Sequence, residues 1–362
     1  MKEDRTSRSL VLVTGAAGSV GHFAVLHLTE AGCRVRALDR PGVEFPFAKC
    51  PGVQLMEADL TGEGVVEEAV KGVDAVIHAA AIEDIGRSWD ELAPVNYHAT
   101  LRLYEAARTQ GVRHFVFVST ASVYAAGPQY QSENAPTAVA NDYVRTKLMS
   151  EQILKEHGGR PTVNIVRPGL IYGPRARVSA GALATAPPML RLFTDHMVTV
   201  TGGPSSNWVH AQDVARALVF LVENPQPHGQ AFNVANDDPV SVGDMFSVAL
   251  KAGGVRMHDP RIPFPTVLVR ALKPLIARDL VMGPVNRVVG ALYRLAVRKA
   301  GLDSPLKPCL DKEALDYALE NWLFDNRLLK SLGFKYKYPR FEEGWLATQD
   351  WYEQNHWVPA GG

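Results

Sequence analysis

The fold is decided by Leu10-Val11-Leu12-Val13-Thr14-Gly15-Ala16-Ala17-Gly18-Ser19-Val20-Gly21 and by the amphipathic run from His22 to Ala31 that follows it. The apolar run at its start predicts a buried parallel strand, and the run after the glycines predicts a helix. Gly15 suits a tight turn, Gly18 lets a pyrophosphate approach the backbone, and Gly21 lets the helix pack closely on the strand. A strand, a glycine turn and a helix N-terminus in this order predict a dinucleotide-binding site.

Acidic residues follow the next two predicted strands. The strand from Arg34 to Leu38 ends at Asp39, at the distance from the glycine turn expected for the carboxylate that binds the ribose hydroxyls of NAD. A carboxylate there repels a 2′-phosphate, so the sequence favours NAD(H), while the neighbouring Arg40 keeps NADP(H) open. The alternative for Asp39 is a turn residue before Pro41-Gly42. Asp59, after the short strand at residues 53–56, is placed to reach the adenine amino group.

The composition is that of a folded chain that acts on small molecules. With 362 residues and 46% hydrophobic content, the chain can bury a large core and form one large and one smaller domain. A formal net charge of zero provides no field that attracts nucleic acid, so the expected partner is a small molecule. Cys33, Cys50 and Cys309 have neither metal-ligand nor disulfide spacing, which predicts no metal site and a reducing, cytoplasmic setting. The polar first nine residues show no secretory signal, and no run reaches the roughly 18 apolar residues of a membrane span.

Apolar strands continue to alternate with helical segments after the glycine turn. Strands are predicted at residues 74–78, 114–118 and 163–166, and helices at 96–110 and 142–157. This alternation predicts an α/β fold, namely a Rossmann-type doubly wound parallel sheet with a smaller, mostly helical substrate-binding domain. We expect residues 8–175, with 208–236 returning, to form the NAD(P)-binding domain, and residues 176–207 and 237–362 to form the substrate-binding domain.

Hydroxyl, phenol and amine groups come together after the predicted strand at 114–118. Ser119-Thr120-Ala121-Ser122 follows that strand, and open parallel sheets bind ligands at the carboxyl ends of their strands. Tyr143 and Lys147 are four residues apart, which places both side chains on one helical face. Such a trio suits hydride transfer at an alcohol carbon, because Lys147 lowers the pKa of the phenol while Thr120 orients the substrate oxygen.

These motifs resemble those of the extended short-chain dehydrogenases/reductases, within the NAD-dependent epimerase/dehydratase superfamily. Residues 14–21 match the family's TGxxGxxG, residues 78–81 its strand-end motif, 143–147 its YxxxK, 167–174 its RPxxxYGP, and 207–215 its return from the substrate domain. By this resemblance the catalytic hydroxyl falls on Thr120 rather than Ser122, because it lies four residues before Tyr124. Asn96 matches an asparagine of the active-site helix; its alternative role is a helix cap.

The resemblance also implies which residues touch cofactor and substrate. The catalytic group is Thr120, Tyr143, Lys147 and Asn96. The cofactor contacts are Gly15, Ala17, Gly18, Ser19, Val20, Gly21, Asp39, Arg40, Asp59, Leu60, Ala79, Ala80, Ala81, Tyr143, Lys147, Pro168, Gly169 and Ile171. The substrate contacts are Ile82, Ser122, Tyr172, Arg175 and His210.

The residue at position 206 helps to separate the branches of this family. Nucleotide-sugar enzymes of the family usually carry an Arg four residues before the position of His210, and here that residue is Ser206. A substrate diphosphate then loses its bidentate partner unless Arg175 or Arg177 replaces it. The sequence therefore favours a hydrophobic alcohol or ketone, as in the 3β-hydroxysteroid dehydrogenase branch or a long-chain β-keto acid reductase. A nucleotide-sugar epimerase or dehydratase is the alternative, and a non-catalytic NAD(H)-binding scaffold is the second.

The segment 261–302 combines basic residues with apolar helical runs. Arg270, Lys273, Arg278, Arg287, Arg294, Arg298 and Lys299 lie in it, and Asp279 is the acid among them. Basic amphipathic helices can lie on an anionic membrane surface, or they can simply cover the substrate cavity. The segment resembles the insertion near the membrane-facing substrate entrance of 3β-hydroxysteroid dehydrogenases. This implies a peripheral membrane contact, and the family resemblance also leaves a homodimer open.

Overall fold

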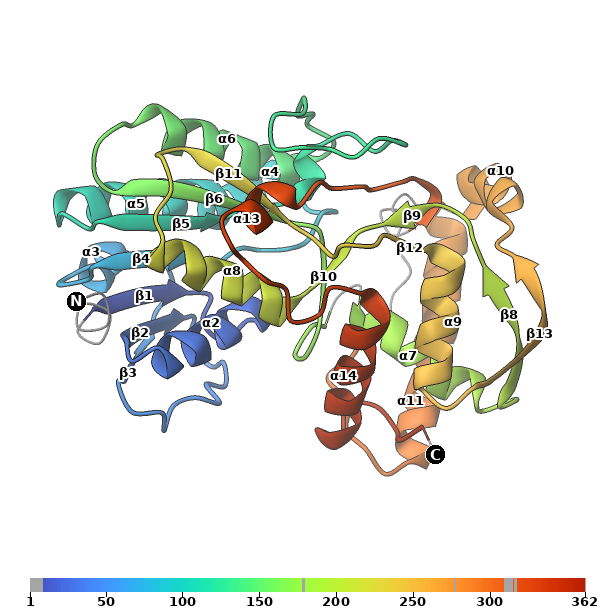
Figure 1. The fold of residues 1–362 in the computed structure, drawn as a ribbon. Helices are drawn as coiled ribbons and strands as arrows, with labels where there is room; N and C mark the ends of the chain where they lie inside the picture. The colour runs from blue at the N-terminus through green and yellow to red at the C-terminus, as the bar shows by residue number, and fades with distance from the viewer. Residues whose placement is uncertain (1–8, 178–179, 277, 309–314, 316–317, 362) are drawn as a thin grey trace.

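A seven-stranded parallel sheet forms the larger part of the molecule (Figure 1). The computed structural model describes residues 9–177, 180–276, 278–308, 315 and 318–361. The strands follow the order β11-β6-β5-β4-β1-β2-β3. Their bounds are β1 (Leu10–Thr14), β2 (Arg34–Asp39), β3 (Val53–Glu57), β4 (Ala75–His78), β5 (His114–Val118), β6 (Thr162–Pro168) and β11 (Gln230–Val234). All neighbouring pairs are parallel, so the predicted fold class is confirmed.

Helices cover both faces of this sheet. On one face, α2 (Ser19–Glu30) and α8 (Ala211–Glu223) pack over buried strand residues such as Val11 and Val13. On the other face lie α3 (Val65–Ala69), α5 (Thr100–Thr109) and α6 (Asp142–Glu156), which pack over Leu10 and Leu12. After β1 the chain forms β2 and the edge strand β3 on one side, and it then returns to form β4 on the other side of β1. The crevice at the carboxyl ends of β1 and β4 is therefore the topological switch point, where such sheets bind their ligands.

A second group of elements lies beside the carboxyl ends of the strands (Figure 1). Its helices are α7 (Ala180–Leu190), α9 (Val242–Ala252), α10 (Thr266–Ile276), α11 (Asp279–Lys299) and α14 (Phe341–Gln354). Its two-stranded sheets pair β7 (Leu170–Tyr172) with β10 (Trp208–His210), β9 (Ser205–Ser206) with β12 (Val240–Ser241), and β8 (His196–Thr201) with β13 (Arg256–Pro263). Of these elements, α7, α9, α11, α14, β7 and β10 share a core of their own, which includes Tyr172, Phe341 and Trp345. The short α13 (Arg327–Ser331) instead places Leu329 in the core of the parallel sheet.

Two predicted helices begin earlier than the sequence suggested. The helix expected from His22 begins at Ser19, because Gly18 has extended backbone angles and serves as its N-cap. The helix expected at 96–110 begins at Trp89 as α4 (Trp89–Ala93), continues through a π-helical segment (Pro94–Ala99), and becomes α5. A capping box between Ser88 and Glu91 starts it. Asn96 lies inside the π-helical segment, so the alternative of a helix cap is wrong.

The glycine turn requires glycine for steric reasons that the structure makes explicit. Gly15 has a φ of 66°, and a Cβ on it would lie 2.8 Å from the backbone nitrogen of Ala80. A Cβ on Gly21 would lie 2.1 Å from the carbonyl oxygen of Gly15. Both distances are far shorter than van der Waals contact, so the turn, the start of α2 and the segment after β4 can pack together only without these side chains.

We expect Gly21→Ala to destabilise the protein. The added methyl group must push the first turn of α2 away from Gly15, and overpacking of this kind costs about 1–3 kcal/mol or more. Urea denaturation measures the free energy of unfolding. Gly158→Ala is the matched control, because nothing lies within 4 Å of the Cβ it would add. Equal losses in the two variants would contradict this account of the turn.

Candidate active site

The glycine turn and Asp39 form a cradle suited to the adenosine diphosphate half of a dinucleotide. A Cβ on Gly18 would have one close neighbour, the Gly15 carbonyl oxygen at 3.2 Å, so the other side of Gly18 is open. Asp39 ends β2 beside the turn, where its Oδ2 accepts the N–H of Ala17 at 2.9 Å and its Oδ1 accepts the N–H of Arg40 at 2.8 Å. The open backbone at the start of α2 fits a diphosphate, and the fixed carboxylate fits ribose hydroxyls.

Asp59 lies at the far end of this cradle, just after β3. Its Oδ1 accepts hydrogen bonds from the backbone N–H and the hydroxyl of Thr61, at 2.8 and 2.7 Å, and these bonds lower the pKa of Asp59. The next residue, Leu60, is buried, and its carbonyl accepts a bond from Arg102 at 2.8 Å. The carboxylate is thus ionised and held in place at the edge of the sheet, as a contact for the adenine amino group requires.

A buried histidine connects the strand before the glycine turn to the first residue of α5. His78 Nδ1 lies 2.7 Å from the hydroxyl of Thr14, and Nε2 lies 2.8 Å from the hydroxyl of Thr100. The Thr100 hydroxyl donates to the carbonyl of Asn96, so Nε2 must carry the proton and Nδ1 must accept from Thr14. Burial and then the charge of Lys147 lower the pKa of His78 to about 3. His78 is therefore neutral, and it serves to position the segment that follows β4.

Asn96 holds the backbone of the segment 79–82 in place. Its Oδ1 accepts the N–H of Ile82 at 2.8 Å, and its Nδ2 donates to the carbonyl of the same residue at 3.0 Å. The Asn96 carbonyl also accepts the hydroxyl of Ser150, which lies on α6. Both ends of the Asn96 amide thus bind Ile82, so this side chain positions the segment that follows β4. Ala79, Ala80, Ala81 and Ile82 remain partly exposed at the strand end.

Tyr143 and Lys147 lie on the first two turns of α6, at the end of β5. Asn141 starts this helix, because its Oδ1 accepts the N–H of Val144 at 2.9 Å. Lys147 Nζ donates to the carbonyl of Val118, the last residue of β5, at 2.9 Å, and lies 5.9 Å from the centre of the Tyr143 ring. An ammonium has three donors, so Lys147 can bind Val118 and still reach a ligand.

Thr120 follows the end of β5, two residues after Val118, whose carbonyl Lys147 binds. It caps a short 3₁₀ helix at residues 121–123, where its hydroxyl oxygen accepts the N–H of Ser122 at 3.1 Å. A hydroxyl that accepts one bond can still donate its own proton, so Thr120 can bind a substrate oxygen. Ser119 cannot take this role, because its hydroxyl donates to Glu151 at 2.6 Å.

Carboxylates control the charge of Lys147. Burial lowers the pKa of Lys147 to about 8, against the opposing influence of Glu83 and Glu151. Neither carboxylate was predicted from the sequence. Glu83 could have been found by the rule that predicted Thr120, since it follows the end of β4. Glu151 could have been found by its helical spacing, since it lies one turn after Lys147 on the same face.

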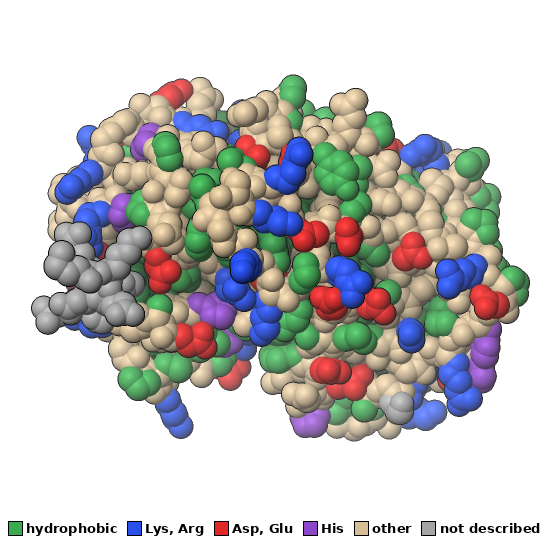
Figure 2. Space-filling view, in the orientation of Figure 1, with side chains coloured by type: hydrophobic (Ala, Val, Ile, Leu, Met, Phe, Trp, Pro, Cys, Tyr) green, Lys and Arg blue, Asp and Glu red, His purple; other side chains and the backbone are tan. Residues whose placement is uncertain are grey.

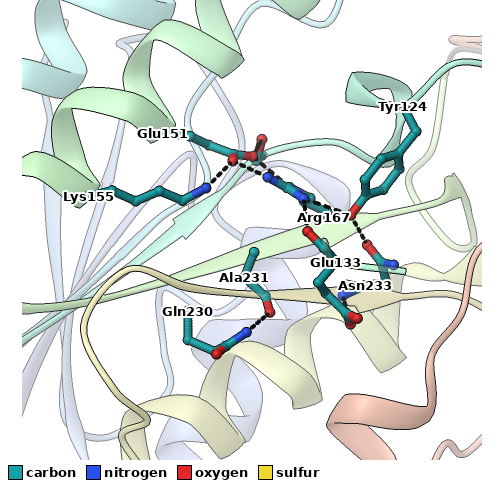
Figure 3. Close-up of polar contacts among 9 residues, drawn as sticks. Tyr124, Glu133, Glu151, Lys155, Arg167, Gln230, Ala231 and Asn233 are labelled. Carbon is teal, nitrogen blue, oxygen red and sulfur yellow. Dashed lines mark hydrogen bonds and ion pairs between the residues drawn. The ribbon is translucent and has the colours of Figure 1, made fainter. Parts of the chain in front are cut away.

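A buried ion pair fixes α6 against β6 (Figure 3). Arg167, at the end of β6, donates to the two oxygens of Glu151 at 2.9 and 2.5 Å. Arg167 also donates to the hydroxyl of Tyr124 at 2.7 Å, and this hydroxyl donates to Asn233 of β11 at 2.8 Å. Arg167 holds the pKa of Glu151 below its usual value despite the burial of the carboxyl. Tyr124 is therefore committed to this network, and the helix that carries Tyr143 and Lys147 is tied to three strands.

The predicted cofactor contacts that begin with the last residue of β6 lie at the strand end, whereas the predicted substrate contact Tyr172 is buried in the core of the second group of elements. Pro168, Gly169 and Ile171 continue from Arg167 along the strand end, and a Cβ on Gly169 would lie 2.6 Å from the carbonyl of Asn207. Tyr172 does not join the cleft: it is fully buried among Phe341, Trp345 and Trp208. Its predicted substrate contact is therefore replaced by a packing role.

His210 and Arg175 lie where the second group of elements meets α2. His210 Nδ1 accepts the N–H of Gln212 at the start of α8, while its buried Nε2 has no hydrogen-bond partner among the described residues. Arg175 has a φ of 67°, and its buried Nε likewise has no partner in the described part of the chain. The charge of Arg175 adds to burial in lowering the pKa of His22 on α2 to about 4. Arg175 therefore contributes a half-buried positive charge beside α2.

Comparisons with known proteins agree with this geometry. A family model described as the NAD dependent epimerase/dehydratase family matches residues 11–235. A dTDP-4-dehydro-6-deoxy-D-allose reductase of a Streptomyces species is 28% identical over 283 residues, covering 70% of this chain and 84% of that protein. A 3 beta-hydroxysteroid dehydrogenase/Delta 5-4-isomerase of Mycobacterium tuberculosis (strain ATCC 25618 / H37Rv) is 31% identical over 284 residues, covering 72% and 74%. The solved structure of MoeE5 in complex with UDP-glucose and NAD has a TM-score of 0.67 and 24% identity, covering 95% of this chain and 99% of that chain.

The fold and the strand-end groups define an extended short-chain dehydrogenase/reductase, an NAD-dependent enzyme built on a Rossmann-type sheet. The chain belongs to the NAD dependent epimerase/dehydratase family. The predicted superfamily and cofactor are thereby confirmed at the level of the family. The likeness to MoeE5 supports the fold alone.

We expect Glu151→Gln to lower the free energy of unfolding by about 3–5 kcal/mol, because Arg167 would remain buried without its counter-charge. Glu105→Gln is the control, since it removes an exposed carboxylate 2.8 Å from Arg108 and should cost below about 0.5 kcal/mol. Denaturant unfolding at pH 7 measures both. Similar losses in the two variants would show that the buried pair contributes no more than a surface pair.

The buried pair of Glu151 and Arg167 also predicts that the free energy of unfolding depends on pH. The pKa of Glu151 lies below its usual value of 4.5 in the folded protein. The contribution of the ionised Glu151 to stability is therefore complete at pH values above this usual pKa. It is lost as the pH falls through the lowered pKa of Glu151 in the folded protein. The difference in stability between the original chain and Glu151→Gln should shrink in that acidic range.

Proposed function

We propose that the protein is an NAD(H)-dependent oxidoreductase that interconverts a secondary alcohol and a ketone on a hydrophobic substrate. Bound NAD supplies the hydride acceptor or donor. Tyr143 takes or gives the proton at the substrate oxygen, Lys147 stabilises the phenolate and binds the ribose beside the nicotinamide, and Thr120 donates to the substrate oxygen. The observation that carries the proposal is the hydrogen bond from Lys147 to Val118, with the Tyr143 ring 5.9 Å away.

The electrostatics of α6 suit acid–base chemistry near neutral pH. A free tyrosine has a pKa of about 10, and a value near 7 requires about 4 kcal/mol of stabilisation of the phenolate. An ammonium on the same helical face supplies part of this, and it acts strongly because burial removes the water that would screen it. With a pKa of about 8, Lys147 is still mostly protonated at neutral pH.

A hydrophobic substrate agrees with the surroundings of Ser206. This residue occupies the position where nucleotide-sugar enzymes of the family carry an Arg, and here it is buried and bridged to Trp322. A guanidinium for a substrate diphosphate is therefore missing from that position. We propose a 3β-hydroxysteroid-like alcohol as the substrate, and a long-chain β-keto acid fits the same catalytic groups.

A nucleotide-sugar epimerase or dehydratase is the second candidate, and Arg175 is the observation that favours it. Arg177 lies over the Trp357 ring at 5.5 Å, whereas the buried Nε of Arg175 has no partner in the described part of the chain. Of these two arginines, we propose Arg175 as the replacement for the missing Arg. A thermal shift with UDP or dTDP, without a shift with a sterol, would favour this candidate.

Tyr143→Phe should reduce turnover by about 10²–10⁴-fold, because it removes the proton donor and acceptor while keeping the ring. NADH binding should be retained, since Lys147 and the glycine turn are unchanged. The measurements are the rate of NADH formation and the fluorescence of bound NADH. Tyr130→Phe is the control, because Tyr130 is an exposed tyrosine outside the site.

One assay with parallel substrates distinguishes the candidate substrate classes. NADH formation is followed with a steroid alcohol, a long-chain 3-hydroxy acid and a UDP-hexose. Retained turnover in Tyr143→Phe would reject the role of the phenol. No turnover with any member of a broad alcohol panel would instead support a non-catalytic NAD(H)-binding scaffold.

We further propose that the protein contacts an anionic membrane surface through α10 and α11. No residue of α10 is buried, and Val267 and Leu280 are 84% and 86% exposed. The segment from Thr266 to Lys299 contains seven Lys and Arg residues and one acidic residue, in a chain of zero net charge. At the upper right of Figure 2, where Figure 1 places α10, apolar and basic side chains lie next to one another. Exposed apolar groups among basic ones fit the interface of an anionic bilayer.

By length and composition the helix at Leu280–Lys299 could also span a membrane, and 28% of its apolar window is buried inside the protein. A single such helix is weak support for a span. Its interspersed basic residues favour a position along the membrane surface.

Vesicle sedimentation tests the membrane contact. The protein should bind phosphatidylglycerol vesicles, bind phosphatidylcholine vesicles less, and lose binding at high salt, since screening weakens the attraction. Val267→Ser combined with Leu280→Ser should weaken binding about tenfold or more. Val139→Ser is the control, because Val139 is 60% exposed on a different surface. Equal binding by the double variant and the control would reject the surface.

We also propose the division into two domains that the sequence predicts, with one amendment. Residues 208–236 supply α8 and β11 to the parallel sheet domain. Leu329 and Phe334 lie within the range assigned to the substrate-binding domain, yet they pack in the core of the sheet. The segment around them is better assigned to the NAD-binding domain.

A further inference from the structure

The segment 321–325 adds a strand-like stretch beside β9. Trp322 forms a parallel bridge with Ser206 of β9. The N–H of Trp322 donates to the carbonyl of Ser205 at 3.0 Å, and the carbonyl of Trp322 accepts the N–H of Asn207 at 2.9 Å. Residues paired in this way carry their side chains on the same face of a sheet, and their strands lie about 4.8 Å apart. The Trp322 indole therefore lies next to the Ser206 side chain.

The other edge of the segment 321–325 binds the loop that follows the short 3₁₀ helix at residues 121–123. The carbonyl of Leu323 accepts the N–H of Gln131 at 2.8 Å, and the N–H of Asp325 donates to the carbonyl of Gln131 at 3.0 Å. Main-chain bonds therefore hold the segment on both edges. A substitution of one of its side chains leaves these bonds in place.

The Trp322 side chain packs against the elements that carry Thr120 and Tyr143. It contacts a small buried apolar cluster that contains Ala121 and Val144. Ala121 directly follows Thr120 in the chain. Val144 directly follows Tyr143, and the Tyr143 ring packs on the same cluster as the indole. Both rings are half-buried, so each keeps an uncovered part near the catalytic groups.

We propose that Trp322 is a specificity-determining residue whose indole binds the ring system of a hydrophobic substrate beside Tyr143. The indole lies next to Ser206, where a substrate diphosphate would need a cation, and it offers a flat apolar surface there instead. An aromatic side chain gives a large contact area at a low cost in conformational entropy. The proposal rests on the proposed function, and it favours a substrate with fused rings over a flexible chain.

The first test compares the kinetics of Trp322→Ala with those of Leu323→Ala. Trp322→Ala should raise KM for a steroid alcohol about tenfold or more and leave kcat nearly unchanged, because the lost contact binds substrate and transition state alike. The kcat/KM for isopropanol should stay the same, since this alcohol is too small to reach the indole. Trp322→Phe should keep most of the affinity. Leu323 is the matched control, because it is also half-buried but alternates to the opposite face.

A label on the indole reports contact with the ligand without turnover. The chain contains six tryptophans, and fluorinated tryptophan gives each of them a fluorine NMR signal. The signal that disappears in Trp322→Phe belongs to Trp322. A steroid alcohol added with NADH, a pair that forms no product, should shift this signal. It should leave the signal of Trp351 unchanged, because Trp351 packs on the core of the second group of elements.

The outcomes separate this proposal from the proposed function. If the original chain turns over no alcohol, the proposed function fails, and a steroid-induced shift of the Trp322 signal still supports the role of the indole. If a steroid alcohol is turned over with the same KM in Trp322→Ala, the proposed function stands and the role of Trp322 is overturned. An unmoved Trp322 signal also overturns it, as does an equal rise of KM in Leu323→Ala. Trp322→Leu repeats the test should the alanine variant fail to fold.

Discussion

The site depends on the way one face of α6 is held against the strand ends. Lys147 donates to the carbonyl of Val118 on β5, Ser150 donates to the carbonyl of Asn96, and Glu151 accepts from Arg167 on β6. A helix that packs on a sheet normally presents apolar residues to it. Here the inward face is polar for two turns, so the register of α6 is fixed by directional bonds as well as by apolar packing.

Such a polar face is stable only because each of its groups finds a partner. Burial of an ammonium and a carboxylate in an apolar core would cost several kcal/mol for each ion. The strand ends reduce this cost, because backbone carbonyls and the Arg167 guanidinium are available there to satisfy Lys147 and Glu151. Helix α6 and the carboxyl ends of the strands therefore stabilise each other, and the same contacts fix the turns of α6 that carry Tyr143 and Lys147.

The sequence predicted the sheet well, because its strands depend on local patterns. Apolar runs identify β1 and β5, and the glycine spacing identifies the turn before α2. The role of Asn96 could not be predicted in this way, because its partner Ile82 is 14 residues away and the bond depends on a π-helical segment. Tyr172 was misplaced for a related reason: its motif shows where the chain turns, but not that Phe341 and Trp345, far along the chain, enclose its ring.

The two parts of the molecule differ in how closely their elements are packed. In the parallel sheet, side chains such as Val11, Leu12 and Val13 are fully buried, so the positions of the strand ends are rigidly specified. In the second part, α10 buries no residue, so its placement depends on much less packing. Reaction chemistry requires atoms fixed to within a fraction of an ångström, and the sheet provides this. The bulky apolar substrate that we propose would need less exact positioning than the reacting atoms, which agrees with the weaker packing of α10.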